Sequence, residues 1–209
     1  MIDQEERVNT SERILDSAKS IFSHRGKHGA RMQEIADLAG VNKALLFYYF
    51  SSKDKLYEEV MRHIITHIFE DINAVVLSGA SPGTKIATVV DTYISYMNDN
   101  PYVPGIISSE VASGAETIKK VLSDLKKSGD LTLPQTMINM LIEGKKNDLL
   151  RDIDPDQTIL SIIGLCIIYF LGKPLIRDIL HIREEEENQF LERRMRHIID
   201  LVENGILKR

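Results

Sequence analysis

Cysteine is the scarcest reactive residue in this sequence of 209 amino acids, because Cys166 is the only one. A single cysteine cannot form a disulfide within the chain, and Cys166 lies in an apolar stretch. A chain without a disulfide framework is typical of the reducing cytosol. We therefore expect a cytoplasmic protein.

Long hydrophobic runs are lacking as well. The longest, residues 159–172, is interrupted by Ser161 and is too short to cross a bilayer. The amino-terminal segment MIDQEERVNT is acidic and polar, which is the wrong character for a signal peptide. The sequence therefore predicts no association with a membrane.

Motifs of catalysis and cofactor binding are also missing. We find no Gly-rich phosphate loop, no zinc-type Cys/His spacing and no nucleophile motif. His63 and His67 are four residues apart with Glu59 and Glu70 nearby, a spacing that metals can use, but no third clear ligand joins them. The four glutamates of residues 184–187 favour the start of a helix. We expect no enzyme, no catalytic residue, no metal and no cofactor.

The residues that are present predict an all-α protein with a sizeable core. Hydrophobic residues make up 43% of the chain, low-complexity tracts are absent, and apolar residues recur at helical spacing. We find no strand pattern and no internal repeat. The expected helices cover residues 10–26, 31–39, 42–49, 52–76, 84–97, 106–128 with a break near Gly114, 133–147, 155–171, 174–182 and 185–206.

Several capping residues mark the ends of these helices. Asn9 and Glu12 fit a capping box that opens the first helix, which leaves residues 1–9 as a loose arm. Ser51 or Ser52 can cap the fourth helix, and Asp154 before Pro155 can cap the helix after it. The helix around residues 159–171 is apolar nearly all round, so we expect it to be buried on several sides.

Charge is distributed unevenly along the chain, whose formal net charge is −5. Residues 10–55 hold eight basic and five acidic side chains, so the remainder of the chain is strongly acidic. A basic head on an acidic body is expected when only one end meets phosphate. Chance variation among solvated charges is the alternative explanation.

The stretch MQEIADLAGVNKALLFYYF, residues 32–50, predicts two short helices joined at Gly40. Ile35, Ala36 and Ala39 give the first helix an apolar side, and Leu46 and Phe50 do so for the second. Gly40 can adopt the left-handed conformation that ends a helix. Such a pair is a helix-turn-helix, whose second helix enters the major groove of DNA.

This stretch and its surroundings resemble the amino-terminal domain of TetR-family repressors over about residues 10–56. The residues that carry the resemblance are Ile14, Leu15, Ala18, Ile21, Phe22, Gly26, Ile35, Ala36, Ala39, Gly40, Val41, Lys43, Phe47, Tyr48, Tyr49, Phe50, Ser52, Lys53 and Leu56. The resemblance implies a DNA-binding domain at residues 1–55 and a helical ligand-binding and dimerisation domain at residues 56–209.

The residues expected to meet DNA come from the outer faces of the two short helices and from the start of the next. They are Arg31, Gln33, Asn42, Lys43, Ala44, Leu45, Phe47, Tyr48, Tyr49 and Lys53. Lys43 can donate to guanine or to phosphate, and an exposed Leu45 suggests contact with a thymine methyl group. Leu45 can instead belong to the core. Lys53 resembles the family's phosphate-binding lysine, and Phe47 stands where the family usually has a tyrosine.

The body is expected to bind a small ligand and a second copy of the chain. Candidates for an apolar pocket are Tyr93, Met97, Ile106, Met137, Met140, Cys166 and Tyr169. Candidates for the dimer interface, on the two most apolar helices, are Ile163, Gly164, Ile167, Leu191, Met195, Ile198, Ile199 and Val202. For both sets the alternative is that the residues simply fill the core of one chain.

Together these features predict a homodimeric, ligand-responsive transcriptional regulator, most simply a repressor that binds a palindromic operator. Two other classes stay open. One is a sequence-tolerant DNA-binding protein of the nucleoid type. The other is a helical ligand-binding protein or enzyme with an unused DNA-binding head, which the departures at Leu45 and Phe47 leave possible.

Overall fold

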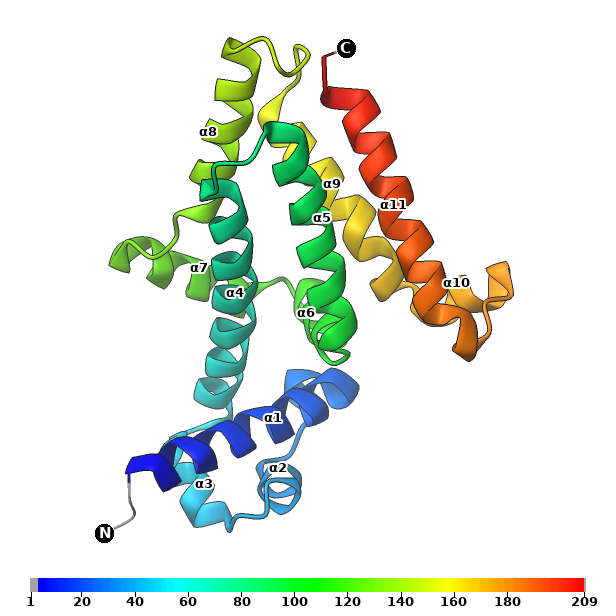
Figure 1. Ribbon diagram of the computed structural model, residues 1–209. Coiled ribbons are helices and arrows are strands. Elements are labelled where there is room, and N and C mark those ends of the chain that lie inside the picture. Colours follow the sequence, from blue (N-terminus) through cyan, green and yellow to red (C-terminus); the bar gives the residue numbers. More distant parts are fainter. Residues whose placement is uncertain (1–3, 209) are drawn as a thin grey trace. The chain divides into compact units, whose positions relative to one another are not determined.

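The computed structural model describes residues 4–208, and the side chains of residues 8–208, as a chain of helices (Figure 1). The predicted all-α class is confirmed. The helices are α1 Gln4–Gly29, α2 Met32–Leu38, α3 Lys43–Tyr49, α4 Lys53–Leu77, α5 Pro82–Asp99, α6 Val103–Ala112, α7 Glu116–Ser128, α8 Leu133–Lys146, α9 Pro155–Leu171, α10 Lys173–Leu180, the 3-10 helix η1 Glu184–Glu186 and α11 Glu187–Ile206.

These helices form two compact units, and the division falls inside α4. The first unit comprises the chain up to Thr66 together with Pro101–Ser128, and the second comprises His67–Asn100 and Gly129–Arg209. The expected boundary at residue 55 therefore does not coincide with the division of the structure. Helices α6 and α7 belong with the helix-turn-helix rather than with the body.

Helix α1 begins earlier than the sequence suggested. It starts at Gln4, so Asn9 lies inside the helix and forms no capping box, and residues 4–9 are not a loose arm. The residue types at positions 4–7, Gln, Glu, Glu and Arg, are good helix formers. The rest of the expected arm, residues 1–3, lies outside the described residues. The predicted break at Gly26 is present (φ 62°, ψ 175°), and helical structure then resumes to Gly29.

The expected interruption between α6 and α7 is confirmed. Gly114 has φ 100° and Ala115 has φ 59°, both left-handed values that end one helix before the next begins. Helix α6 starts sooner than predicted, at Val103, because Pro104 is tolerated in the first turn, where its missing N–H has no helical partner. Ser52, Ser81 and Asp154 cap α4, α5 and α9.

The first unit is held together by an apolar core under α1. Ile14, Phe22 and Leu46 are fully buried, and the ring of Phe22 meets that of Tyr57 edge to face at 4.8 Å. Helix α6 approaches α1 closely: a Cβ added at Gly105 would lie 3.0 Å from the backbone oxygen of Ser23. A larger residue at this position would push the two helices apart.

A buried carboxylate links α6 to α7 in the same unit. Glu110, only 3% exposed, accepts hydrogen bonds from the backbone N–H groups of Thr117 (2.5 Å) and Ile118 (3.3 Å). These are otherwise unpaired donors in the first turn of α7, and a negative charge there is favoured by the helix dipole. Burial and this carboxylate together raise the pKa of Tyr57.

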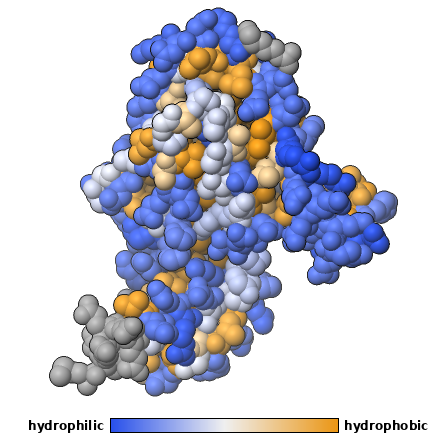
Figure 2. All heavy atoms as spheres, in the orientation of Figure 1, coloured by the Kyte–Doolittle hydropathy of each residue, from blue (hydrophilic) through white to orange (hydrophobic). Residues whose placement is uncertain are grey.

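The second unit packs α5, α8, α9 and α11 around an apolar core. Helix α9 contributes Ile162, Cys166 and Tyr169, all nearly inaccessible to solvent. The expectation that α9 is buried on several sides is wrong for the single chain, because Leu160 is 63% and Ile168 54% exposed. The neighbouring helices cover only one side of it. On the face drawn in Figure 2 most of the surface is hydrophilic, and hydrophobic side chains gather in separate patches.

Three residues predicted for the dimer interface lie in this core instead. Leu191, Ile198 and Val202 are 6%, 0% and 7% exposed, so they have almost no surface left for a partner. They face inward because the apolar stripe of α11 packs on α5 and α9 of the same chain. The other candidates retain solvent-accessible surface: Ile163 and Gly164 are exposed, and Ile167, Met195 and Ile199 are partly exposed.

Candidate functional site

The turn between α2 and α3 fixes the angle of the helix-turn-helix. Gly40 adopts φ 65°, and the N–H of Val41 donates to the carbonyl of Ala36 at 3.0 Å, which closes α2. The guanidinium of Arg13 donates to the carbonyl of Ala39 at 2.5 Å and so ties this turn to α1. The sequence pattern identified Gly40 but not the role of Arg13, because a contact across 26 residues has no local signature.

Helix α3 presents one side to solvent, as a recognition helix must. Leu46 is fully buried and Phe50 is 9% exposed, and these two anchor the helix to the rest of the unit. The predicted residues Lys43, Ala44, Phe47 and Tyr48 are all exposed, with Tyr48 at 65%. The exposed side therefore offers an ammonium group, a phenol and two apolar groups to a ligand.

Other residues predicted to contact DNA, on α3 and at its start, interact with other parts of the same chain. The side-chain oxygen of Asn42 accepts the N–H of Leu45 at 2.7 Å and caps the helix, and its amide N–H₂ remains as a donor for DNA. Leu45 is half-buried rather than exposed, so only part of its side chain can reach a base. Tyr49 is also half-buried, and its hydroxyl is buried without a hydrogen-bond partner.

Two exposed cations of the helix-turn-helix remain free of carboxylates. Arg31, just before α2, and Lys43, at the start of α3, form no ion pair with any described residue. The ammonium of Lys43 lies 6.0 Å from the centre of the Phe47 ring, a cation–π contact. Gln33 is exposed, and its amide donates to Asp37 at 2.7 Å.

Lys53, the expected phosphate contact at the start of α4, is engaged with the end of α1. Its ammonium donates to the carbonyls of His28 (3.1 Å) and Ala30 (3.2 Å). An ammonium has three donors, so one remains for a phosphate. Nearby, Lys27 pairs with Asp54 at 3.0 Å, which lowers the pKa of the Asp54 carboxyl.

An ion-pair network joins α4 to α7 in the same unit. Glu58 accepts from Lys120 of α7 at 2.5 Å and from Lys55 at 3.3 Å, while Arg62 lies 3.6 Å from Asp124 of α7. The hydrogen bond from Lys120 is the main reason that the pKa of Glu58 falls below its usual 4.5. The unit that carries the recognition helix is thus braced by charges as well as by its core.

Most of the residues predicted to line an effector pocket are buried in the hydrophobic core. Met97, Met137, Cys166 and Tyr169 are buried in the second unit, Tyr93 and Met140 are half-buried there, and Ile106 is buried in the first unit. The structure therefore does not bring the whole set together. Burial raises the pKa of the Cys166 thiol to about 12, which keeps it protonated and unreactive.

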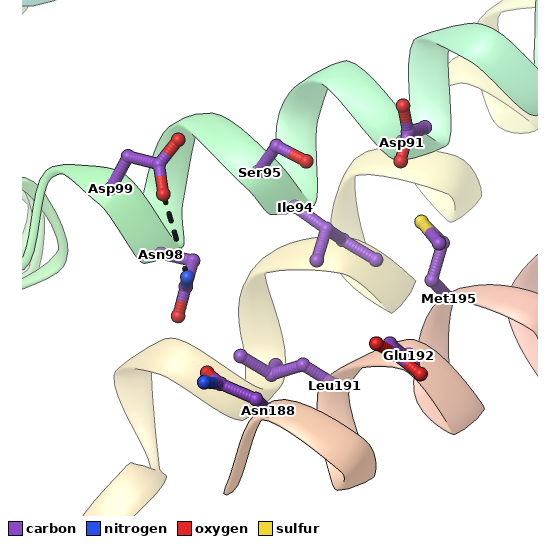
Figure 3. A pocket seen from close by; sticks show the side chains of 9 residues that line it. All are labelled: Asp91, Ile94, Ser95, Asn98, Asp99, Asn188, Leu191, Glu192 and Met195. Atoms are coloured by element: carbon purple, nitrogen blue, oxygen red, sulfur yellow. Dashed lines mark hydrogen bonds between the residues drawn. The ribbon is translucent and has the colours of Figure 1, made fainter.

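One groove of the second unit lies between α5 and α11 and is shown in Figure 3. It encloses about 330 Å³; Asp91, Ile94 and Asp99 of α5 lie on one side, and Leu191 and Glu192 of α11 lie on the other. All three carboxylates are exposed, so water satisfies them without a bound cation. We assign this groove no ligand.

Neither a metal centre nor a spanning helix emerges from the described residues. No three side chains of His, Cys, Asp or Glu among them are placed to hold a metal ion. No single helix in residues 4–208 has both the length and the apolar character to cross a bilayer. Helices α9 and α10 pass that test only when joined, and they are bent by 78°.

Comparison with known proteins gives two family matches. Residues 14–60 match the model of bacterial regulatory proteins of the tetR family, and residues 82–202 match that of a tetracyclin repressor-like C-terminal domain. Among curated relatives, the HTH-type transcriptional regulator RutR of Escherichia coli (strain K12) is 33% identical over 150 residues, which cover 71% of this chain and 68% of RutR.

Solved structures share the fold at low sequence identity. The ketosteroid transcriptional regulator KstR2 of Mycobacterium tuberculosis superposes with a TM-score of 0.71 at 19% identity, covering 95% of each chain. FadR of Bacillus subtilis, solved in complex with stearoyl-CoA, gives 0.69 at 16% identity, covering 91% of this chain and 96% of FadR. Both agree with a helix-turn-helix head on a helical body.

Proposed function

The chain belongs to the TetR family of bacterial regulatory proteins, and from that premise we propose that it is a cytoplasmic repressor that binds a palindromic operator as a homodimer. A small apolar or amphipathic effector releases it from the DNA. The observation that carries the DNA-binding part is the exposed side of α3, which presents Lys43 and Tyr48. Arg31, just before α2, is exposed as well.

These groups divide the work of recognition. Lys43, near the start of α3, enters the major groove and donates to a guanine or to a phosphate beside it. Arg31, the hydroxyl of Tyr48 and the remaining donor of Lys53 hold phosphates, which fix the orientation of the helix but read no sequence. Leu45 contributes at most a partial apolar contact to a thymine methyl group, since it is half-buried.

The exposed apolar side of α9 supports the dimer. Ile163 and Gly164 face solvent, and nothing lies within 4 Å of a Cβ added at Gly164, so a partner helix can approach the backbone there. A symmetric pair would carry two recognition helices to successive major grooves, about 34–36 Å apart when the half-sites are one turn apart. Palindromic operators follow from that symmetry.

Release by an effector follows if the ligand favours a dimer whose recognition helices are wrongly spaced. The ligand can weaken DNA binding only by as much as it prefers that state. FadR of Bacillus subtilis was solved with stearoyl-CoA, an amphipathic molecule. We propose the same broad ligand class, but not the same compound, for this chain.

The DNA-binding roles are tested with two substitutions in the helix-turn-helix. Arg31→Ala should weaken binding about equally for all sequences and reduce the salt slope by about 1, because one phosphate contact is lost. Lys43→Ala should weaken binding to the operator by about tenfold or more and relax its base preference. Lys119→Ala is the control, since this exposed lysine lies on α7 and pairs with Glu116. Wild-type affinity in both test variants, measured by titration at several salt concentrations, would refute the assigned contacts.

A further inference from the structure

A cavity of the second unit lies among α9, α10 and α11, apart from the groove of Figure 3. It encloses about 310 Å³, near the lower end of the range for small-molecule sites. Its apolar walls are Ile168, Ile176, Ile179, Leu180 and Phe190. Two further side chains that line it, Tyr169 and Arg194, carry polar groups.

Arg194 brings an uncompensated positive charge to this cavity. Its side chain is half-buried and donates to the carbonyl of Leu165 at 2.8 Å, and it forms no ion pair with a carboxylate among the described residues. A guanidinium has five N–H donors, so most of them remain available. An arginine partly withdrawn from water beside apolar walls gains from meeting an anion.

Tyr169 forms part of the apolar wall of the cavity. The residue is 2% exposed, its hydroxyl oxygen is inaccessible to solvent, and its ring lies 5.1 Å from that of Phe190. Burial, with smaller contributions from the charge of Glu187 and from a hydrogen bond to that carboxylate, raises the pKa of Tyr169 to about 12, so the hydroxyl keeps its proton. The hydroxyl is therefore directed to Glu187, and Arg194 is the polar group left for a ligand.

The charges around the cavity favour an anion over a cation. The carboxylate of Glu187 is already paired with Lys173 and with Arg177, the latter at 3.6 Å. Lys173 and Arg177 therefore neutralise this carboxylate, and Arg194 is the charged side chain that lines the cavity. A cation would be repelled, and a purely apolar molecule would leave the charge of Arg194 without a counter-ion.

We propose that this cavity is a binding site for an amphipathic monoanion, a carboxylate on an apolar body. Arg194 holds the carboxylate, and the apolar walls contact the rest. The inference deepens the effector part of the proposed function, on which it rests, because it names a site and a chemical class. The site shares only Tyr169 with the residues that the sequence indicated for a pocket.

The first experiment is calorimetric titration of the full-length protein, without DNA, with three probes that share one chain length. Octanoate carries the anion, 1-octanol has a neutral head and octylamine a cationic one. Octanoate should bind at least tenfold more tightly than octanol, since hydrogen bonds to a charged group exceed neutral ones by about that factor. Octylamine should give no measurable binding.

A matched pair of substitutions on α10 locates the site. Ile179 lines the cavity and Leu175 does not, yet they are 63% and 64% exposed on the same helix. Ile179→Glu should weaken octanoate binding at least tenfold, because it places a negative charge in the wall, whereas Leu175→Glu should keep the wild-type affinity within about twofold. Arg194→Met should weaken octanoate binding about tenfold while leaving the fold intact, as checked by circular dichroism.

Three results would overturn the proposal. Octanoate that fails to bind, or binds no better than octanol, would remove the anion site. If Ile179→Glu and Leu175→Glu lose octanoate affinity equally and both have the mass of a monomer, that result would assign this face to a second copy of the chain. The titration uses no DNA, and operator binding is measured on the unliganded protein. A failure of the ligand site can therefore be distinguished from a failure of DNA binding.

Discussion

At the scale of single residues, the angle of the helix-turn-helix depends on Gly40. Its φ of 65° lies in the left-handed region, and an added Cβ would also come within 3.0 Å of the Arg13 guanidinium that holds this turn. Arg13 in turn bonds the carbonyl of Ala39. The backbone conformation and this tertiary contact therefore constrain the same position.

We predict that Gly40→Ala lowers the free energy of unfolding by about 1–2 kcal/mol, because a Cβ is unfavourable in the left-handed conformation. Gly79→Ala is the matched control: nothing lies within 4 Å of its added Cβ, so the change should be within about 0.5 kcal/mol. Urea denaturation of both variants measures the difference. Equal stabilities would mean that the turn can take another conformation at no cost.

Individual contacts were the least predictable part of the site. The pattern predicted Asn42 and Lys53 as DNA contacts, and the structure gives each an internal role, in capping α3 and in bonding the end of α1. Asparagine suits both helix capping and contact with a base, so the residue type alone does not show which role it has. The bond from Arg13 to Ala39 had no sequence signal at all.

At the scale of elements, the link between α4 and α7 is electrostatic. Glu58 is held by Lys120 and Lys55, and its side chain is only 13% exposed. Its pKa lies below the usual 4.5, so its ionised form is favoured by folding. The resulting stabilisation is fully present above the unfolded pKa and is lost as the pH falls through the folded one.

We predict that wild type is more stable than Glu58→Gln by about 1 kcal/mol near pH 7, the upper end for partly exposed ion pairs. The difference should shrink as the pH falls below about 4.5, because the wild-type carboxyl becomes neutral. Thermal unfolding at a series of pH values measures it. Glu116→Gln, at an exposed glutamate of α7, serves as the control. A difference independent of pH would show that charge is not the cause.

Most element boundaries followed from the sequence where caps and breakers were local, although the capping box expected at Asn9 does not form. Gly26, Gly114 and Asp154 all mark the expected places, since each acts on its own backbone. The partner of an apolar stripe is not local information. Ile198 was predicted to face a second chain and is instead fully buried within its own, because periodicity shows which side is apolar but not what covers it.

At the scale of the whole molecule, the apolar side of α9 supports a pair of chains. Leu160 and Ile163 on α9 are exposed apolar residues that a single chain leaves in water. Exposed apolar surface of this kind marks an interaction site in soluble proteins. A dimer also doubles the number of phosphates that one particle contacts, which tightens binding and makes it more sensitive to salt.

We predict that Ile163→Glu converts the protein to a monomer and weakens operator binding at least a hundredfold, because the second half-site is no longer coupled to the first. Leu77→Glu, a change at an exposed apolar residue at the end of α4, should remain dimeric. Sedimentation equilibrium measures the mass of each variant. A dimeric Ile163→Glu protein would place the interface elsewhere.

DNA binding shows whether the exposed side of α3 reads a specific sequence. The affinity of the wild-type protein for the DNA upstream of its own gene is compared with that for random DNA of equal length at one fixed salt concentration. The account predicts a preference of about a thousandfold or more, in the range of specific regulators. Equal, salt-sensitive binding to both would contradict it and indicate a sequence-tolerant protein of the nucleoid type.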